Sequence, residues 1–351
     1  MFKLETRVTN EFTEDIMIVS NAITGVGRAL AIALSFMSFA AFGDDAMLQI
    51  CLGAAADYSP VFPTSTIPAS AGEVTAVFRF ANAETHKSIV GTWIAVDVGA
   101  AAPPNSVLVK TAPKDQAAKG RLWFSLPRPL PVGKYRLEVA ADGKPWKSTE
   151  FSVVADALPP QLRATDALLP STRTWTYDFI QRAGAGAKID MPGVTPDSEG
   201  RYRALVVMRV TGSDNFGQHV EMRRNGQLVF EEWWRVDDKG WAATKRKTSD
   251  QVVLLDPPQL LVTLPLGTTS KWSYAPRDAS YHQTYKMFGP LGIKTPSGEA
   301  PGYVVFVEQA GGRVDLSVER HFVPGVGITR ETIITALDHE MVSRQEMILK
   351  P

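Results

Sequence analysis

Residues 218–236, QHVEMRRNGQLVFEEWWRV, are the stretch that decides the fold of the second half of this chain. Two runs with alternating apolar side chains flank Asn225–Gly226. This dipeptide favours a two-residue β-hairpin turn, because both of its residues must reach positive φ. A two-residue turn would place Arg224 opposite Gln227, and strand pairing would run outward from that point. The stretch therefore predicts an antiparallel hairpin.

Further short β-type runs follow the hairpin towards the end of the chain. They include Tyr303–Val307 and Gly327–Ala336, and the 3.6-residue periodicity of helices is almost absent after residue 57. Two Trp-x-Tyr segments, at Trp175–Tyr177 and Trp272–Tyr274, indicate a sheet built from two similar halves. We therefore predict an all-β fold whose larger domain, over 173–350, is a curved antiparallel sheet or half-barrel.

One tract of this domain resembles a known group of proteins. Glu319–Glu331, ERHFVPGVGITRE, lies downstream of Trp272-Ser-Tyr274. It has an aromatic strand that runs into a Pro-Gly-Val-Gly turn, and then a strand with an Arg-Glu pair. This pattern is similar to one in bacterial exported proteins of unknown function. The resemblance implies a curved antiparallel sheet like the half-barrels of periplasmic lipoprotein carriers, and it brings no catalytic residues with it.

A smaller domain is predicted over 73–155. Lys134–Val154 contains two β-type runs around Asp142–Gly143, a dipeptide that favours a tight hairpin. A Leu-Pro-x-Gly-x-Tyr segment, Leu130–Tyr135, leads into this hairpin. This end of the domain resembles the last hairpin of bacterial immunoglobulin-like modules, which implies a small β-sandwich.

The N-terminal segment is typical of a secretory signal peptide. Ala29–Gly43 is an uninterrupted apolar run that follows Arg28 and ends before Asp44–Asp45. The run is shorter than the roughly 20 apolar residues of a membrane-spanning helix. We expect a cleaved signal helix within 1–43, while an uncleaved anchor and a buried helix remain open. Residues 1–16 are mixed in charge and form either an unusual extension or a misassigned start.

Two further segments are predicted as connections. Residues 44–72 are rich in Pro, Ser, Thr and Ala in their second half, a composition that suits a flexible spacer. Residues 156–172 carry prolines and would link the two domains. The expected order is therefore signal peptide, spacer, immunoglobulin-like sandwich, linker and curved sheet.

The composition excludes some classes of protein. Lysine plus arginine equals aspartate plus glutamate at 37 each, so the formal net charge is zero. This balance argues against a nucleic-acid-binding protein, which usually has a basic excess. Cys51 is the single cysteine, so no disulfide can form within the chain, and an exported chain of this kind must be held by its packed cores.

No catalytic motif stands out in the sequence. The five histidines are scattered, without the close spacings that metal sites often use. We therefore expect no catalytic residue, no metal and no cofactor. In the hairpin register given above, His219 would face Glu232, and a histidine beside a carboxylate can act as a general base. The alternative hypothesis is thus a periplasmic hydrolase that uses this His219/Glu232 face.

Aromatic side chains supply the candidate binding site. Rings on strands usually pack in a core, but they can also line a pocket for an apolar ligand. The candidate ligand-binding residues are Phe230, Trp234, Trp241, Trp272, Tyr274 and Phe322. We expect an exported envelope protein of binding or structural type, in the periplasm or outside the cell, that engages a partner protein or an apolar ligand. Nucleic acid is not expected as a partner, and a membrane tether would require an uncleaved signal.

Overall fold

A computed structural model of the chain describes most of the sequence after the N-terminal segment. The described ranges are 46–114, 117–126, 129–156, 174–189, 191–248, 251–267, 269–278, 280–310 and 314–351. Within them the chain forms strands and three 3-10 turns, η1 (Ala69–Ala71), η2 (Ala81–Ala83) and η3 (Gly99–Ala101), and no α-helix. The predicted all-β class is confirmed, whereas the predicted signal helix lies outside the described residues.

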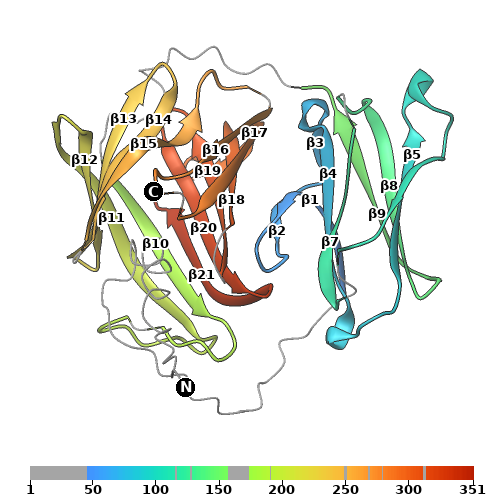
Figure 1. The fold of residues 1–351 in the computed structure, drawn as a ribbon, viewed down its shortest axis with the longest axis horizontal. Helices are drawn as coiled ribbons and strands as arrows, with labels where there is room; N and C mark the ends of the chain where they lie inside the picture. Colours follow the sequence, from blue (N-terminus) through green and yellow to red (C-terminus); the bar gives the residue numbers. More distant parts are fainter. Residues whose placement is uncertain are drawn as a thin grey trace, which may run out of the picture.

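The first nine strands form two sheets that pack face to face (Figure 1). One sheet has the order β2 (Pro60–Pro63), β1 (Met47–Ala54), β4 (Glu73–Arg79) and β7 (Lys119–Ser125). The other has the order β3 (Thr66–Pro68), β9 (Lys144–Val154), β8 (Gly133–Ala141), β5 (Ile89–Asp97) and β6 (Ser106–Thr111). Their shared core contains fully buried rings and aliphatic side chains such as Phe78, Trp93 and Leu137.

The predicted spacer over 44–72 is wrong for the part of it that the structure describes. Residues 46–56, an apolar stretch, supply β1, which pairs with β4 and buries its last five residues. Pro60 and Pro68 lie in β2 and β3, and both of these strands are at sheet edges. A proline, which has no N–H to donate, is tolerated at an edge strand. A proline-rich composition therefore does not distinguish a spacer from a pair of edge strands.

The last twelve strands form one sheet that curves strongly and nearly closes on itself (Figure 1). Every neighbouring pair in it is antiparallel. The first half consists of β10 (Thr174–Ala183), β11 (Arg201–Asp214), β12 (Gly217–Arg224), β13 (Gln227–Asp237), β14 (Gly240–Lys247) and β15 (Val252–Thr263). The second half consists of β16 (Thr269–Tyr274), β17 (His282–Thr295), β18 (Gly298–Ala310), β19 (Asp315–Val323), β20 (Gly327–Leu337) and β21 (Glu340–Leu349).

Each half is a six-stranded meander, and the two are joined through the pairing of β10 with β21. Strands β15 and β16 are the two edges of the sheet. Side chains bridge these edges: Trp272 Nε1 donates a hydrogen bond to the carbonyl oxygen of Leu260 at 3.0 Å, and Gln259 of β15 donates to Tyr285 of β17 at 2.6 Å. The predicted curved antiparallel sheet is therefore confirmed.

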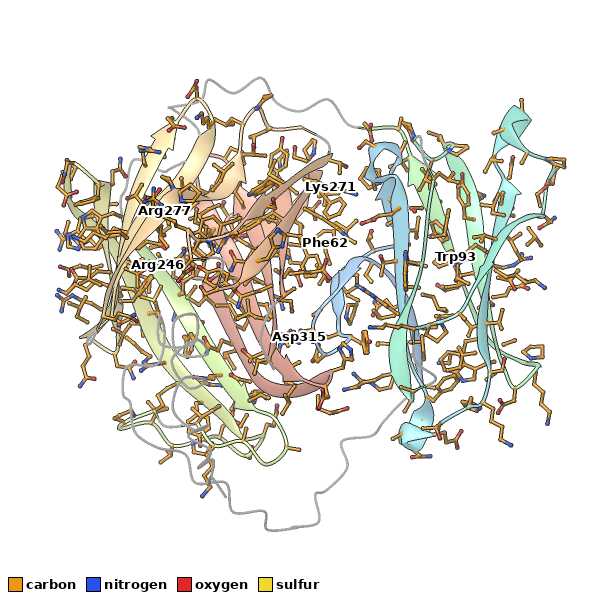
Figure 2. The ribbon with its side chains drawn as sticks, in the orientation of Figure 1. Phe62, Trp93, Arg246, Lys271, Arg277 and Asp315 are labelled. Atoms are coloured by element: carbon orange, nitrogen blue, oxygen red, sulfur yellow. The ribbon has the colours of Figure 1, made fainter. Side chains whose placement is uncertain are left out.

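The outer face of the curved sheet packs against the sandwich. Phe306 and Ile334 form a small buried cluster with Val61, and Val304 extends the sandwich core. Figure 2 shows Phe62 between these two parts of the molecule, Trp93 within the sandwich and Arg246 within the curved sheet. Because neighbouring residues of a strand point to opposite faces, the residues between these outward ones, such as Val305, fill the interior of the curved sheet.

Candidate functional site

The interior of the curved sheet contains a cavity of about 120 Å³. Its walls come from both meanders, from β10 to β15 and from β17 to β21. Most of the lining is apolar, with rings and long aliphatic side chains such as Tyr177, Met208 and Ile328. The cavity is therefore bounded by the main hydrophobic core of the second domain.

Three of the six predicted ligand-binding residues line this cavity. They are Phe230, Trp234 and Trp241, and the last two rings meet edge to face with centroids 4.7 Å apart. Phe322 is fully buried behind Trp241, with ring centroids 6.1 Å apart. Trp272 and Tyr274 on β16 are outside the lining. The structure thus brings half of the candidate set to one site.

Two ion pairs project into the interior, one from each half of the sheet. Arg246 Nε donates to Glu232 Oε1 at 2.7 Å, between β14 and β13. Arg320 Nε donates to Glu331 Oε2 at 2.7 Å, between β19 and β20. Burial alone would lower the pKa of Arg246, but the Glu232 carboxylate outweighs this and raises it. The charges of the four ionised side chains in the lining therefore sum to zero.

Amide and hydroxyl groups form a short chain of hydrogen bonds beside these pairs. Gln259 Nε2 donates to the Tyr285 hydroxyl at 2.6 Å and to Gln283 Oε1 at 2.5 Å. The Tyr285 hydroxyl donates in turn to Gln283 Oε1 at 2.7 Å. Burial raises the pKa of Tyr285 to about 12, so this hydroxyl stays protonated and remains a donor at neutral pH.

Three buried polar atoms of the lining have no hydrogen-bond partner among the residues that the structure describes. They are Trp241 Nε1, Gln259 Oε1 and Arg320 Nη1. The Trp241 side chain is 1% exposed and Gln259 is 4% exposed, so bulk water does not reach these two groups freely. An unsatisfied buried polar group costs about 1–3 kcal/mol. Residues that line the cavity therefore carry two donors and one acceptor that a bound molecule could satisfy.

Apart from Glu232, the polar members of this lining were not among the candidate residues predicted from the sequence, although one of them had a usable signal. Lys245-Arg246-Lys247 has the composition of a solvated strand end. Side chains alternate along a strand, and Arg246 accordingly points inward to Glu232 while Lys245 lies over Trp233 at 4.1 Å on the other face. The alternation of side chains along a strand would have assigned Arg246 to the opposite face of the sheet from Lys245 and Lys247.

The predicted pairing of His219 with Glu232 is wrong. The hairpin turn is as predicted, with Arg224 opposite Gln227, but the register then shifts, because Met222 pairs with Phe230 and Arg223 with Leu228. This bulge places His219 opposite Trp233, against which its ring is stacked with centroids 4.4 Å apart. A single extra residue in one strand exchanges the two faces of everything beyond it.

The carboxylate beside His219 is Glu231, on the outer face. His219 Nε2 lies 2.7 Å from Glu231 Oε2, and Lys247 Nζ donates to Glu231 Oε1 at 2.7 Å. Burial raises the pKa of Glu231, but the hydrogen bonds from Lys247 and His219 outweigh it and hold that pKa below its ordinary value. Glu232 faces the interior, so it is not the carboxylate partner of His219 that the hydrolase hypothesis requires.

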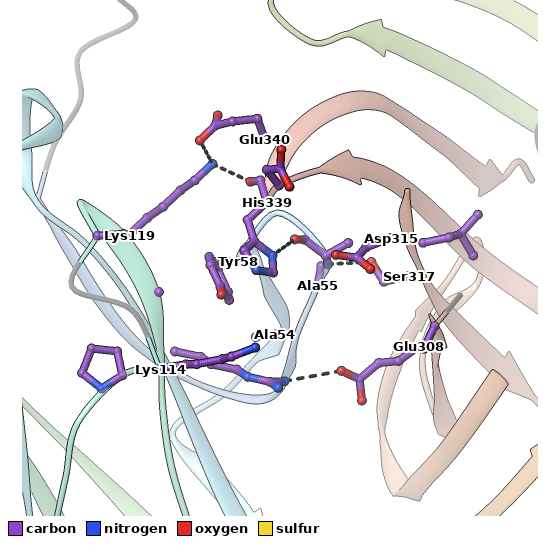
Figure 3. A pocket seen from close by; sticks show the side chains of 18 of the residues that line it. Ala54, Ala55, Tyr58, Lys114, Lys119, Glu308, Asp315, Ser317, His339 and Glu340 are labelled. Carbon is purple, nitrogen blue, oxygen red and sulfur yellow. Dashed lines mark hydrogen bonds and ion pairs between the residues drawn. The ribbon is translucent and has the colours of Figure 1, made fainter. Parts of the chain in front are cut away.

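A second and larger hollow, of about 690 Å³, separates the sandwich from the curved sheet (Figure 3). Basic side chains line it on the sandwich side, and acidic side chains line it on the side of the curved sheet. Two ion pairs cross it, Lys119 to Glu340 at 3.0 Å and Arg121 to Glu308 at 3.4 Å. These partly exposed pairs connect the two walls, and each contributes about 1 kcal/mol or less.

At this cleft the turn between β1 and β2 contacts the curved sheet. Figure 3 shows the Tyr58 ring beside His339, with ring centroids 4.3 Å apart. His339 Nδ1 lies 3.0 Å from the carbonyl oxygen of Ala56, whose N–H donates to Ser317 Oγ at 3.0 Å. Much of the cleft is therefore part of the contact between the two domains.

The comparisons with known proteins are sparse. No family model matches the chain. A search of curated proteins likewise gives no match. One solved structure to which the chain is similar comes from Bacteroides fragilis and is described as a "putative exported protein with YmcC-like fold". The two sequences are 9% identical, the TM-score is 0.23, and the match covers 52% of this chain and 97% of the other.

Two kinds of feature are absent from the part of the chain that the structure describes. In those ranges no three His, Cys, Asp or Glu side chains are grouped so that they could hold a metal ion. In the same ranges, no helix has the length and apolar character that crossing a bilayer requires.

Proposed function

We propose that this chain is a binding protein that holds a small, largely apolar molecule inside its curved sheet. The observation that carries this proposal is the interior cavity, in which Phe230, Trp234 and Trp241 stand beside unpartnered polar atoms. Ligand sites are typically apolar concavities with a few polar groups that fix orientation. The cavity fits this description in its chemistry, and its volume of about 120 Å³ restricts the ligand, or the part of it that enters, to a small one.

The compartment and the sandwich belong to the same proposal. The apolar run Ala29–Gly43 supports export, to the periplasm or beyond. An immunoglobulin-like assignment of the sandwich is supported by its strand order, with β1, β4 and β7 in one sheet and β9, β8, β5 and β6 in the other. It is also supported by Tyr135, whose hydroxyl donates to the Pro131 carbonyl at 2.6 Å, as in the tyrosine corner of such modules.

The test is a ligand-dependent rise in thermal stability. A molecule that binds only the folded state stabilises it by RT ln(1 + [L]/Kd), which is about 2.7 kcal/mol at a hundredfold excess over Kd. Val318→Phe would fill the cavity that Val318 lines, and Val252→Phe places the same ring on an exposed position as a control. We expect small apolar probes to stabilise the native chain and Val252→Phe, but not Val318→Phe. Equal shifts in all three would place binding elsewhere and refute the proposal.

A partner protein is the second candidate, and the edge strand β6 favours it. Three consecutive side chains of β6 are exposed, Val107 at 57%, Leu108 at 38% and Val109 at 36%. An exposed apolar edge strand can pair with a strand of another chain. Val107→Lys should abolish retention of such a partner, while Val252→Lys, on another exposed edge, should leave it intact. Retention that survives Val107→Lys would exclude this edge.

A further inference from the structure

We propose that the molecule held in the interior cavity is uncharged and carries both a hydrogen-bond acceptor and a hydrogen-bond donor on a small apolar body. This inference rests on the proposed binding function and specifies the ligand class. It follows from three properties of the lining, which are its unpartnered atoms, its charge balance and its volume.

The unpartnered atoms define what the ligand must offer. Trp241 Nε1 and Arg320 Nη1 are donors, because an indole N–H and a guanidinium N–H cannot accept. Gln259 Oε1 is an acceptor, since the Nε2 of the same amide already donates to Gln283 and Tyr285. A molecule that satisfies both kinds of group needs an acceptor atom and an N–H or O–H donor, as in a carboxamide or an alcohol.

The charge balance decides against an ionic ligand. Glu232 is already paired with Arg246, and Glu331 with Arg320, so the lining has no net charge to neutralise. An anion at Arg320 would have to leave water and would then compete with Glu331 for the same guanidinium. Burying a charge without a free counter-charge is strongly unfavourable. An uncharged acceptor can use the free Nη1–H without that cost.

The volume limits the size of the apolar body. An engineered cavity of about 150 Å³ in another protein stays dry and binds benzene. The present cavity, of about 120 Å³, is slightly smaller. A ligand with about as many non-hydrogen atoms as benzene is therefore the largest that enters whole. Trp234 and Trp241 would contact its apolar part, while the polar group would lie towards Gln259 and Arg320.

The experiment compares four probes that have the same number of non-hydrogen atoms. Butanamide is uncharged with a donor and an acceptor, 2-pentanone has an acceptor alone, butanoate is an anion at neutral pH, and benzene has no hydrogen-bonding group. Their dissociation constants for the full chain are measured by calorimetric titration at pH 7. We expect butanamide to bind about tenfold more tightly than each of the others, a difference that corresponds to roughly one additional satisfied polar group.

A pair of tryptophan variants locates the effect. Trp241→Phe removes an unpartnered indole N–H, so it should lower the affinity for butanamide and 2-pentanone about fivefold or more without changing that for benzene in the same way. Trp272→Phe removes an indole N–H that is already bonded to Leu260 outside the cavity, and it should preserve the order of the four probes. If Trp241→Phe does not fold, the indole N–H resonance of Trp241 in the native chain replaces it, and butanamide should shift this signal more than benzene does.

The outcomes separate the ligand class from the binding function. Butanoate that binds as tightly as butanamide would overturn the uncharged class, and benzene or 2-pentanone that does so would overturn the role of the polar atoms. In each of those cases the proposed binding function would stand. If none of the four probes binds, the cavity holds water only, and the inference and the proposed function both fail.

Discussion

Replacing Glu232 by glutamine should destabilise the curved sheet strongly, because the substitution leaves the Arg246 guanidinium without its counter-charge. The two side chains are mostly buried, with 10% and 18% of their surfaces exposed, and Arg246 Nε lies 2.7 Å from Glu232 Oε1. At that distance and an effective dielectric constant of about 20, Coulomb's law gives roughly 6 kcal/mol of attraction. Desolvation offsets much of this attraction, and breaking one side of a buried pair costs about 3–5 kcal/mol in known cases. Because this pair is not fully buried, we expect a cost of about 3 kcal/mol for Glu232→Gln.

The assay is a double-mutant cycle with Arg246→Gln, in which the free energy of unfolding is measured in urea. Each single variant should cost about 3 kcal/mol, whereas the double variant should cost about 2 kcal/mol less than the sum, because the unpaired charge is then absent. The exposed pair Arg277–Asp256 is a matched control, since its contact is as short, at 2.6 Å, but its side chains are 83% and 58% exposed. Asp256→Asn should cost less than about 1 kcal/mol. Additive costs in the cycle, or equal losses at the buried and exposed pairs, would refute the reasoning.

Four further outcomes are expected. The Cys51 thiol, which is buried and whose pKa is raised to about 12, should react with a disulfide reagent at pH 8 only after unfolding, and rapid labelling of the native chain would contradict its burial. The pKa of Glu231 is lowered in the folded state from its ordinary value of about 4.5, so its carboxylate stabilises the fold above that pH, and this contribution is lost as the pH falls through the lower, folded value. Glu231→Gln should therefore make the free energy of unfolding fall less steeply on the acid side. An unchanged slope would argue against the lowered pKa. Gly53→Ala would bring a Cβ within 2.9 Å of the Phe306 ring and should cost about 1–3 kcal/mol in thermal unfolding, so a neutral result would show that the two domains adjust freely. Tyr135→Phe removes one hydrogen bond and should cost about 0.5–1.5 kcal/mol by the same measurement, with a larger loss pointing to a role beyond that bond.

Local turn chemistry was the part of the fold that could be predicted most sharply. Asn225–Gly226 and Asp142–Gly143 each join two paired strands, and all four residues have positive φ. These dipeptides specify the turn by backbone sterics alone, and no distant contact is needed. The alternation of apolar residues beyond them indicated strands, and the scarcity of helical periodicity indicated the all-β class.

Which residues of those strands face the interior of the sheet could not be predicted equally well. The bulge near Val229 lies in a hairpin that is part of a sheet of twelve strands. A register counted outward from the turn assumes no bulge, so it could not predict this shift. Because of it, His219 is beside Glu231 while Glu232 lies within the interior. The cavity also depends on Arg320 and Gln259, which are far apart in sequence, so their meeting is a property of the closed topology and not of any local motif.

The gap between β15 and β16 has a consequence for how a guest molecule could reach the interior. Elsewhere in the described part of the sheet, neighbouring strands are joined by backbone pairing. This gap is crossed instead by the hydrogen bonds from Trp272 to Leu260 and from Gln259 to Tyr285 and Gln283, and by the contacts of Arg277 with Asp256. Opening this gap would break about four hydrogen bonds and one exposed ion pair, each worth roughly 1 kcal/mol or less. A sheet closed by a continuous row of backbone hydrogen bonds would have to break these bonds before a ligand could enter or leave. Closing the sheet here with a few side-chain contacts would allow loading and release while the remaining strands stay folded.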